Sequence, residues 1–158
     1  MGDPAGIGPE VIAKALADRA LTRLCTPVVV GSRQVMERTI AWLKLPLQVV
    51  DFNPANGQRL KAGQVAVADP LESPLPKFRM GAATAVTGAA SIAFIKEAVK
   101  LAQAGSLGGI VTAPINKEAM NMAGFHYPGH TELLADLTKT TEFGMMIVGG
   151  PLKIMFAT

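Results

Sequence analysis

The chain of 158 residues is long enough to bury a core, and its length fits a single domain. Hydrophobic residues make up 49% of the chain and charged residues 17%, which fits either an apolar α/β core or a surface covered by another domain or subunit. The net charge of +3 is spread without a basic run, aromatic residues reach only 5%, and no apolar run approaches the length of a membrane span, so nucleic-acid and membrane binding are not expected.

Cys25 is the single cysteine of the chain. With one cysteine, the chain can form neither an intramolecular disulfide nor a metal cluster held by several thiolates. Because Cys25 follows an apolar helical pattern, it is predicted to be a small core residue. No charged-then-apolar leader opens the chain, and we expect a protein of the cytoplasm.

Helical and strand-like patterns alternate through the first half of the chain. Pro9 and Glu10 suit a first helical turn, and Ser32 can cap a second helix. In chain order, the prediction is a helical pattern over residues 9–24, a strand at 27–31, a helix at 33–44, a strand at 47–52 and a strand at 65–68.

The second half begins with the longest predicted helix, which ends at Gly105. Asn116 can cap a later helix that Gly124 ends. In chain order, the prediction is a helix from 87 or 88 to 104, a strand at 108–112, helices at 116–123 and 131–137, and strands at 143–148 and 152–157.

This alternation predicts an α/β protein with a doubly wound sheet and helices on both faces. The two ends of the chain do not complete such a sheet. The chain begins inside a loop-to-helix turn and ends on a predicted strand. We therefore expect an incomplete α/β unit that belongs to a longer protein.

Two stretches of small residues precede predicted helices. The first, residues 2–10, can present backbone N–H groups to a phosphate or carboxylate, or can be only a tight turn. It lacks the third glycine of a dinucleotide fingerprint and the Lys of a P-loop. The second, residues 81–88, favours close helix packing over anion binding.

The two histidines lie four residues apart in a polar stretch that follows the apolar run 109–111. The carboxyl end of a buried strand is where open α/β sheets place ligands. His126 and His130 do not suit a shared zinc ion, because Pro128 and Gly129 interrupt a helix between them. His130 and Thr131, at the start of a short helix, suit an oxyanion better. His126 stays unassigned and is expected in a loop.

Lys117 follows the same predicted strand. Its ammonium group either lies over a substrate phosphate or carboxylate, or is solvated in a first helical turn. The sequence leaves both alternatives open.

Three stretches together resemble the 4-hydroxythreonine-4-phosphate dehydrogenase family of vitamin B6 biosynthesis. They are Gly-Asp-Pro-Ala-Gly-Ile-Gly-Pro-Glu at 2–10, Thr-Ala-Pro-Ile-Asn-Lys at 112–117 and Tyr-Pro-Gly-His-Thr-Glu at 127–132. The match corresponds to roughly the N-terminal half of the family sequence. The first stretch is also similar to the opening loop of isocitrate and isopropylmalate dehydrogenases. The resemblance implies their three-layer α/β fold, with residues 1–158 as the incomplete N-terminal portion of a two-domain dehydrogenase.

The resemblance implies a reaction as well: the NAD- or NADP-dependent oxidation of 4-phosphohydroxy-L-threonine. The 3-keto acid formed then decarboxylates to 3-amino-2-oxopropyl phosphate. A divalent metal such as Zn, Mg or Co polarises the reacting oxygens in that family. The family's metal-binding histidines fall beyond Thr158, so no metal ligand is expected within this chain. Members are homodimers whose active sites borrow residues from the neighbouring subunit.

Residue by residue, the family's substrate-binding His-Thr pair falls on His130 and Thr131. Lys117 and Asp3 are further candidates for binding the phosphorylated substrate, whereas catalytic and cofactor-binding residues are left unassigned. The 158-residue chain by itself is expected to bind substrate weakly and not to turn over.

Two alternatives remain at this point. One is a related dehydrogenase of D-threonate or D-erythronate 4-phosphate, or of a dihydrodiol carboxylate. The other is a non-catalytic binding module built on the same scaffold.

Overall fold

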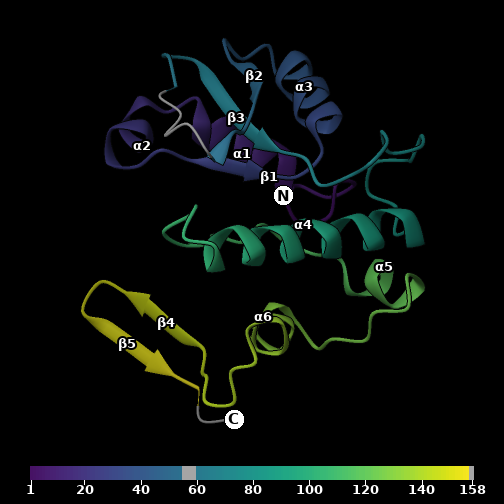
Figure 1. The fold of residues 1–158 in the computed structure, drawn as a ribbon, viewed down its shortest axis with the longest axis vertical. Helices are drawn as coiled ribbons and strands as arrows, with labels where there is room; N and C mark the ends of the chain where they lie inside the picture. The colour runs from purple at the N-terminus through teal and green to yellow at the C-terminus, as the bar shows by residue number, and fades with distance from the viewer. Residues whose placement is uncertain (55–59, 157–158) are drawn as a thin grey trace.

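The computed structural model describes residues 1–54 and 60–156 of the chain. In chain order its helices are α1 (Gly8–Leu16), α2 (Arg19–Leu24), α3 (Arg33–Trp42), α4 (Ala85–Gln103), α5 (Lys117–Met122) and α6 (His130–Thr138). Its strands are β1 (Val28–Val30), β2 (Gln48–Asp51), β3 (Gln64–Ala68), β4 (Met146–Gly149) and β5 (Leu152–Met155). The strands form two separate sheets, and Figure 1 shows α4 crossing the molecule between the larger sheet and helices α5 and α6.

The larger sheet is parallel, with the strand order β1-β3-β2. Parallel strands need helical crossovers, and α3 connects β1 to β2 in this way. Residue 1 extends the hydrogen bonding at the β1 edge of the sheet, because the Met1 amine donates to the Val30 oxygen at 2.8 Å. The predicted α/β class is therefore confirmed, and the larger sheet is parallel.

The main core forms where α1, α3 and α4 meet this sheet. Valine side chains of the strands pack with apolar residues spaced three and four apart on the helices, as an amphipathic helix requires. Its largest fully buried side chains include Met36 of α3 and Phe94 of α4. Ser32 caps α3 by accepting a hydrogen bond from the Val35 N–H, as predicted.

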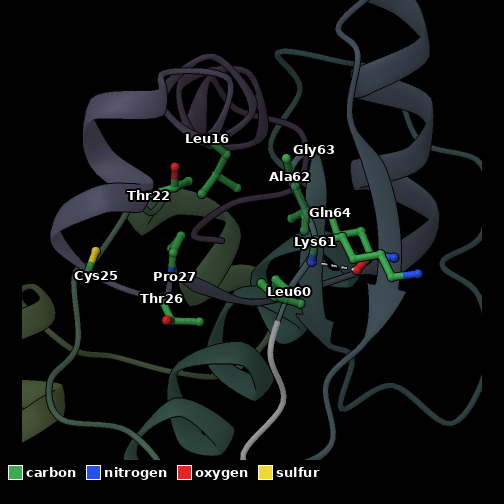
Figure 2. A pocket seen from close by; sticks show the side chains of 11 residues that line it. Leu16, Thr22, Cys25, Thr26, Pro27, Leu60, Lys61, Ala62, Gly63 and Gln64 are labelled. Carbon is green, nitrogen blue, oxygen red and sulfur yellow. Dashed lines mark hydrogen bonds between the residues drawn. The ribbon is translucent and has the colours of Figure 1, made fainter.

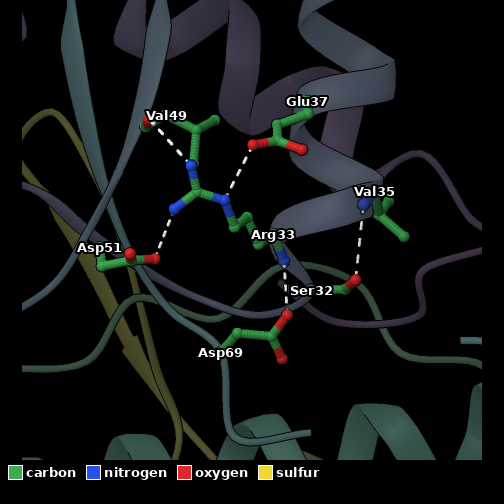
Figure 3. A network of polar contacts seen from close by, with 7 residues as sticks. All are labelled: Ser32, Arg33, Val35, Glu37, Val49, Asp51 and Asp69. Atoms are coloured by element: carbon green, nitrogen blue, oxygen red, sulfur yellow. Dashed lines mark hydrogen bonds and ion pairs between the residues drawn. The ribbon is translucent and has the colours of Figure 1, made fainter. Parts of the chain in front are cut away.

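Arg33, the first residue of α3, links the helix to the carboxyl ends of the neighbouring strands (Figure 3). Its backbone N–H donates to Asp69 Oδ2 at 2.7 Å, just after β3. Its guanidinium donates to Asp51 at the end of β2 and to Glu37 one turn along α3. Both carboxylates raise the pKa of Arg33, the hydrogen bond to Asp51 most of all.

A second core lies on the other side of α4, against α5 and α6. It contains Ile92, Ile95 and Val99 of α4 together with Met120 of α5 and Leu133 of α6. The helices α4 and α5 approach closely at Gly88, where an added Cβ atom would lie 1.9 Å from the Ala119 oxygen. Close packing, which the small residues at 81–88 favoured, is what the structure shows at Gly88.

The strands β4 and β5 form an antiparallel hairpin, which pairs with no other strand among the described residues (Figure 1). Every residue of the two strands is exposed. The strands were predicted at 143–148 and 152–157; Ala157 lies outside the described residues.

The strand predicted at 108–112 is wrong. The described residues include no ladder partner for this stretch, and it has no regular secondary structure. Val111 is 98% exposed, so the apolar run is not buried. A strand needs a neighbour for its backbone N–H and C=O groups, and local apolar sequence cannot supply one.

Two smaller predictions also fail. The pattern over residues 9–24 forms two helices, because Asp18 accepts a hydrogen bond from the Ala20 N–H and begins α2. Cys25 is exposed rather than a core residue, because the chain turns into extended backbone at the end of α2. Among the described residues, no helix is long and apolar enough to cross a membrane.

Candidate functional site

The structure brings together the three stretches that the sequence singled out. The glycine-rich loop, residues 2–8, lies against Ala113 and Pro114. The Asp3 N–H donates to the Pro114 oxygen at 2.9 Å. Gly2 has a φ of +73°, and a Cβ atom there would lie 2.3 Å from the same oxygen, so only glycine allows this approach.

The glycine-rich loop itself is mostly buried and uses its polar groups internally. Asp3 is 4% exposed, and its Oδ1 accepts the Ala5 N–H at 2.9 Å. The Gly6 N–H donates to the Asp3 oxygen at 3.0 Å. Gly8 lies against Met1 and Ala113 with no room for a side chain. These contacts favour the tight-turn alternative for residues 2–8 over an open anion cradle.

The N-terminus of α6, unlike the glycine-rich loop, has backbone N–H groups that no side chain caps. Gly129, at its cap position, offers no side chain, and no side-chain hydrogen bond caps the helix. The first backbone N–H groups of a helix lack partners within it and favour negative charge. Glu132 Oε2 lies only 3.5 Å from where a Gly129 Cβ would be, so its carboxylate is close to this end of the helix.

His130, the first residue of α6, carries an unpartnered polar atom. Its Nε2 is shielded from solvent and has no hydrogen-bond partner within the described residues. A buried polar atom without a partner costs about 1–3 kcal/mol, so such an atom needs an explanation. Burial lowers the pKa of His130, a hydrogen bond to the Ala113 backbone opposes this, and the Met1 ammonium group lowers it further.

The other candidates lie around this ring. Thr131 is half-buried beside it in the first turn of α6, and its hydroxyl forms no hydrogen bond within residues 1–54 and 60–156. Lys117 is exposed at the start of α5, and its ammonium makes no ion pair with a described residue. His126 lies in a loop, as predicted, with Nδ1 3.1 Å from Asn121 Oδ1.

No metal centre is assembled in the part of the chain that the structure describes. No three or more His, Cys, Asp or Glu side chains gather there in a way that can hold an ion. His126 is turned to Asn121, with Nδ1 3.1 Å from Oδ1. The residues present therefore do not fit a metal ion by themselves.

Two hollows in the surface lie away from these residues. Figure 2 shows one at the amino ends of β1 and β3, lined by Thr22, Cys25 and Lys61 among others. The other lies between β1, β3 and the segment that follows α4, with Val28, Ala66 and Leu107 in its lining. Neither includes a residue of the three stretches, and ligands of open α/β sheets bind at the carboxyl ends of strands.

Sequence reasoning missed Ala113 as a contact of the glycine-rich loop. Its backbone oxygen lies against Gly2 and its side chain faces Gly8. An alanine has no chemistry that a pattern search can detect. Its place in the polar stretch 112–117 was an available signal. That stretch was interpreted as following a strand at 108–112, which the structure does not contain.

The chain matches known proteins along most of its length. Residues 23–158 match the family model described as "Pyridoxal phosphate biosynthetic protein PdxA". A 4-hydroxythreonine-4-phosphate dehydrogenase of Trichlorobacter lovleyi is 38% identical over the whole chain, which covers 47% of that relative. A D-threonate 4-phosphate dehydrogenase of Pectobacterium atrosepticum is 42% identical over 98% of this chain and 48% of its own length.

Solved structures agree with these matches. A 4-hydroxythreonine-4-phosphate dehydrogenase from Burkholderia phymatum superposes with a TM-score of 0.87 at 37% identity, over 98% of this chain and 47% of its own. A terephthalate 1,2-cis-dihydrodiol dehydrogenase from Burkholderia xenovorans gives a TM-score of 0.69 at 27% identity, over 98% of this chain and 44% of its own. The chain thus spans about half the length of the relatives it matches. On the family match over residues 23–158, this chain belongs to the PdxA family of pyridoxal phosphate biosynthetic proteins.

Proposed function

We propose that this chain supplies part of the substrate site of a dehydrogenase that oxidises 4-phosphohydroxy-L-threonine with NAD or NADP. The alcohol becomes a 3-keto acid, which loses CO2 to give 3-amino-2-oxopropyl phosphate. The family match and the relatives named 4-hydroxythreonine-4-phosphate dehydrogenase support this substrate. Because the chain spans about half their length, we propose that the 158 residues alone bind substrate weakly and do not turn over.

The observation that carries the proposed role is the unpartnered Nε2 of His130. It lies in the first turn of α6, beside a Thr131 hydroxyl that is also without a partner among the described residues. Imidazole, hydroxyl and uncapped helix N–H groups together suit the oxygens of a phosphate or carboxylate. We assign His130 and Thr131 to holding this anionic group.

The further candidates take different roles. Lys117 is free of ion pairs within the described residues, so its ammonium is available to a phosphorylated substrate. Asp3 is buried with Oδ1 bonded to Ala5, which suits a supporting role better than direct contact with an anion.

The metal and the second domain of the enzyme are parts of the proposal that the described residues do not supply. A divalent metal is part of the proposal for the whole enzyme, and the described residues gather no ligand set for it. A three-layer fold of the isocitrate dehydrogenase type, a second domain, a homodimer and a cytoplasmic location also stay predictions.

A D-threonate 4-phosphate dehydrogenase is the second candidate function. The relative from Pectobacterium atrosepticum that carries this name is 42% identical to the chain. D-Erythronate 4-phosphate and a dihydrodiol carboxylate are further members of this alternative, and the dihydrodiol dehydrogenase structure superposes less well. Measuring NAD reduction by the complete enzyme on each substrate separates them, since preference for an acid without an amino group would contradict the first proposal.

The role of His130 is tested by substrate binding to the complete enzyme. His130→Ala is expected to raise the dissociation constant for the phosphorylated substrate about tenfold or more, because a hydrogen bond to a charged group is lost. His126→Ala is the matched control, since His126 is exposed and bonded only to Asn121 in the described structure. Equal affinities of the two variants and the unmodified enzyme would remove His130 from the site.

A further inference from the structure

Tyr127 links the loop that precedes α6 to the last turn of the same helix. Its hydroxyl donates to Asp136 Oδ2 at 2.6 Å, a length typical of a hydrogen bond from a hydroxyl to a carboxylate. This hydrogen bond is also the largest cause of the raised pKa of Tyr127. The Tyr127 ring packs against the second core, so the loop is held both at the ring and at the hydroxyl.

The place of Asp136 on α6 does not favour the helix itself. Asp136 lies in the last turn of α6, which ends at Thr138. The negative end of the helix dipole disfavours a carboxylate there. The hydrogen bond from Tyr127 therefore gives this carboxylate a role that the stability of the helix does not.

The first turn of α6 is weakly held by the helix's own contacts. Its first backbone hydrogen bond, from the Leu133 N–H to the Gly129 oxygen, is long at 3.4 Å. Gly129 provides no side-chain cap. Only Pro128 and Gly129 separate Tyr127 from the start of the helix at His130. A Tyr127 side chain that is fixed to the last turn therefore restrains where the first turn lies.

The first turn of α6 carries His130 and Thr131, the two residues assigned to anion binding. We propose that Tyr127 is a positioning residue, which by donating to Asp136 holds this turn where His130 and Thr131 meet the anionic group of the substrate. Tyr127 acts through the turn and does not have to touch the substrate. Its importance for binding rests on the proposed function of His130 and Thr131.

The test makes two measurements on variants of the complete enzyme. Hydrogen exchange of the 129–133 backbone without ligand reports how firmly the first turn is held. The Kd for 4-phosphohydroxy-L-threonine reports binding. Tyr127→Phe removes only the hydroxyl, and it is expected to speed the exchange of the Leu133 N–H. We expect it to raise Kd about three- to tenfold, as the loss of one hydrogen bond does, and to change KM more than kcat.

Asp136 provides a matched pair of variants. Asp136→Ala removes the acceptor and should reproduce both effects of Tyr127→Phe. Asp136→Asn keeps an amide oxygen for the hydroxyl and should retain most of the exchange protection and affinity. The double variant of Tyr127→Phe and Asp136→Ala should be no more impaired than either single variant, because the two side chains act as one unit.

Thr138→Val is the control within the same helix. The Thr138 hydroxyl donates to the Leu134 oxygen at 2.8 Å, so this change removes a hydrogen bond of α6 away from its first turn. Exchange at 129–133 and the Kd should match those of the unmodified enzyme. Unchanged exchange and an unchanged Kd in folded Tyr127→Phe would overturn the proposal, and so would additive effects of Tyr127→Phe and Asp136→Ala.

His130→Ala separates the positioning role from the proposed function. If His130→Ala weakens substrate binding and Tyr127→Phe does not, the proposed function stands and the positioning role is wrong. If His130→Ala leaves binding unchanged, the proposed function fails, while the exchange measurement still decides whether Tyr127 holds the turn.

Discussion

At the scale of single residues, the fold removes two titratable groups from water near the candidate site. The amine of Met1 is buried against Val30, and burial lowers its pKa from 8.0 to about 6. The His130 ring is half-buried with a lowered pKa, to which the Met1 ammonium contributes. Each group binds protons less tightly in the folded chain than in the unfolded one.

The stability of the 158-residue chain is therefore expected to depend on pH. Between pH 6 and 8 the unfolded Met1 amine holds more protons than the folded one, so the free energy of unfolding rises with pH. A lowering of about two pKa units corresponds to roughly 2–3 kcal/mol lost as the pH falls from 8 to 6. His130 adds to the loss below pH 6.5. Urea unfolding at a series of pH values measures both effects.

His130→Asn separates the two contributions. The variant should keep the dependence between pH 6.5 and 8 and lose part of the decrease below pH 6.5. A free energy of unfolding that does not change between pH 6 and 8 in the unmodified chain would contradict the burial of the amine.

At the scale of elements, the contact between α4 and α5 depends on the absence of a side chain at Gly88. Alanine normally stabilises the interior of a helix over glycine by about 1 kcal/mol. Here a Cβ atom would lie 1.9 Å from the Ala119 oxygen, so the two helices would have to move apart. We expect Gly88→Ala to lower the free energy of unfolding by about 3 kcal/mol, as overpacking does.

Ala89→Gly, at the next and exposed position of α4, is the matched control. It lowers helix propensity without touching α5 and should cost about 1 kcal/mol. Thermal and urea unfolding of both variants compare the two effects. A Gly88→Ala chain as stable as the unmodified one would show that α4 and α5 do not pack as described.

At the scale of the whole molecule, the hairpin of β4 and β5 exposes a run of large apolar side chains. Met146, Ile147, Val148, Leu152, Ile154 and Met155 are each between 45% and 63% exposed. A two-stranded hairpin is marginally stable alone, and its open edges can pair with other chains. The 158-residue chain is therefore expected to self-associate as its concentration rises.

Sedimentation velocity measures this association. Ile147 and Ile154 face each other across the hairpin, so replacing both with Thr removes apolar surface but keeps strand propensity. The double variant should remain monomeric at concentrations where the unmodified chain associates. Leu24→Thr, which removes another exposed apolar side chain far along the sequence, should not have this effect. Equal association of both variants would exclude the hairpin as the surface.

Local sequence signals were sufficient to predict many of the helices. Ser32 and Asn116 cap the helices that they were predicted to cap, because a cap depends on a side chain and a backbone N–H three residues on. Apolar spacing was sufficient for α3 and α6, which bury one face each. Asp18, which begins α2, was an available cap signal that the prediction did not use.

For the candidate site, the sequence predicted a short helix that begins near His130 and Thr131, and α6 begins at His130. The residue types of His130 and Thr131, and their place at the start of a short helix, follow from the chain alone, because neighbours in sequence share a helix turn. The sequence also determined the family, through three motifs whose order and spacing survive without any tertiary information. Tertiary structure alone decided that residues 109–111 lie exposed, since a strand exists only where another strand pairs with it. It alone placed the glycine-rich loop against Ala113 and Pro114, because burial and hydrogen bonds between distant segments depend on how the whole chain packs.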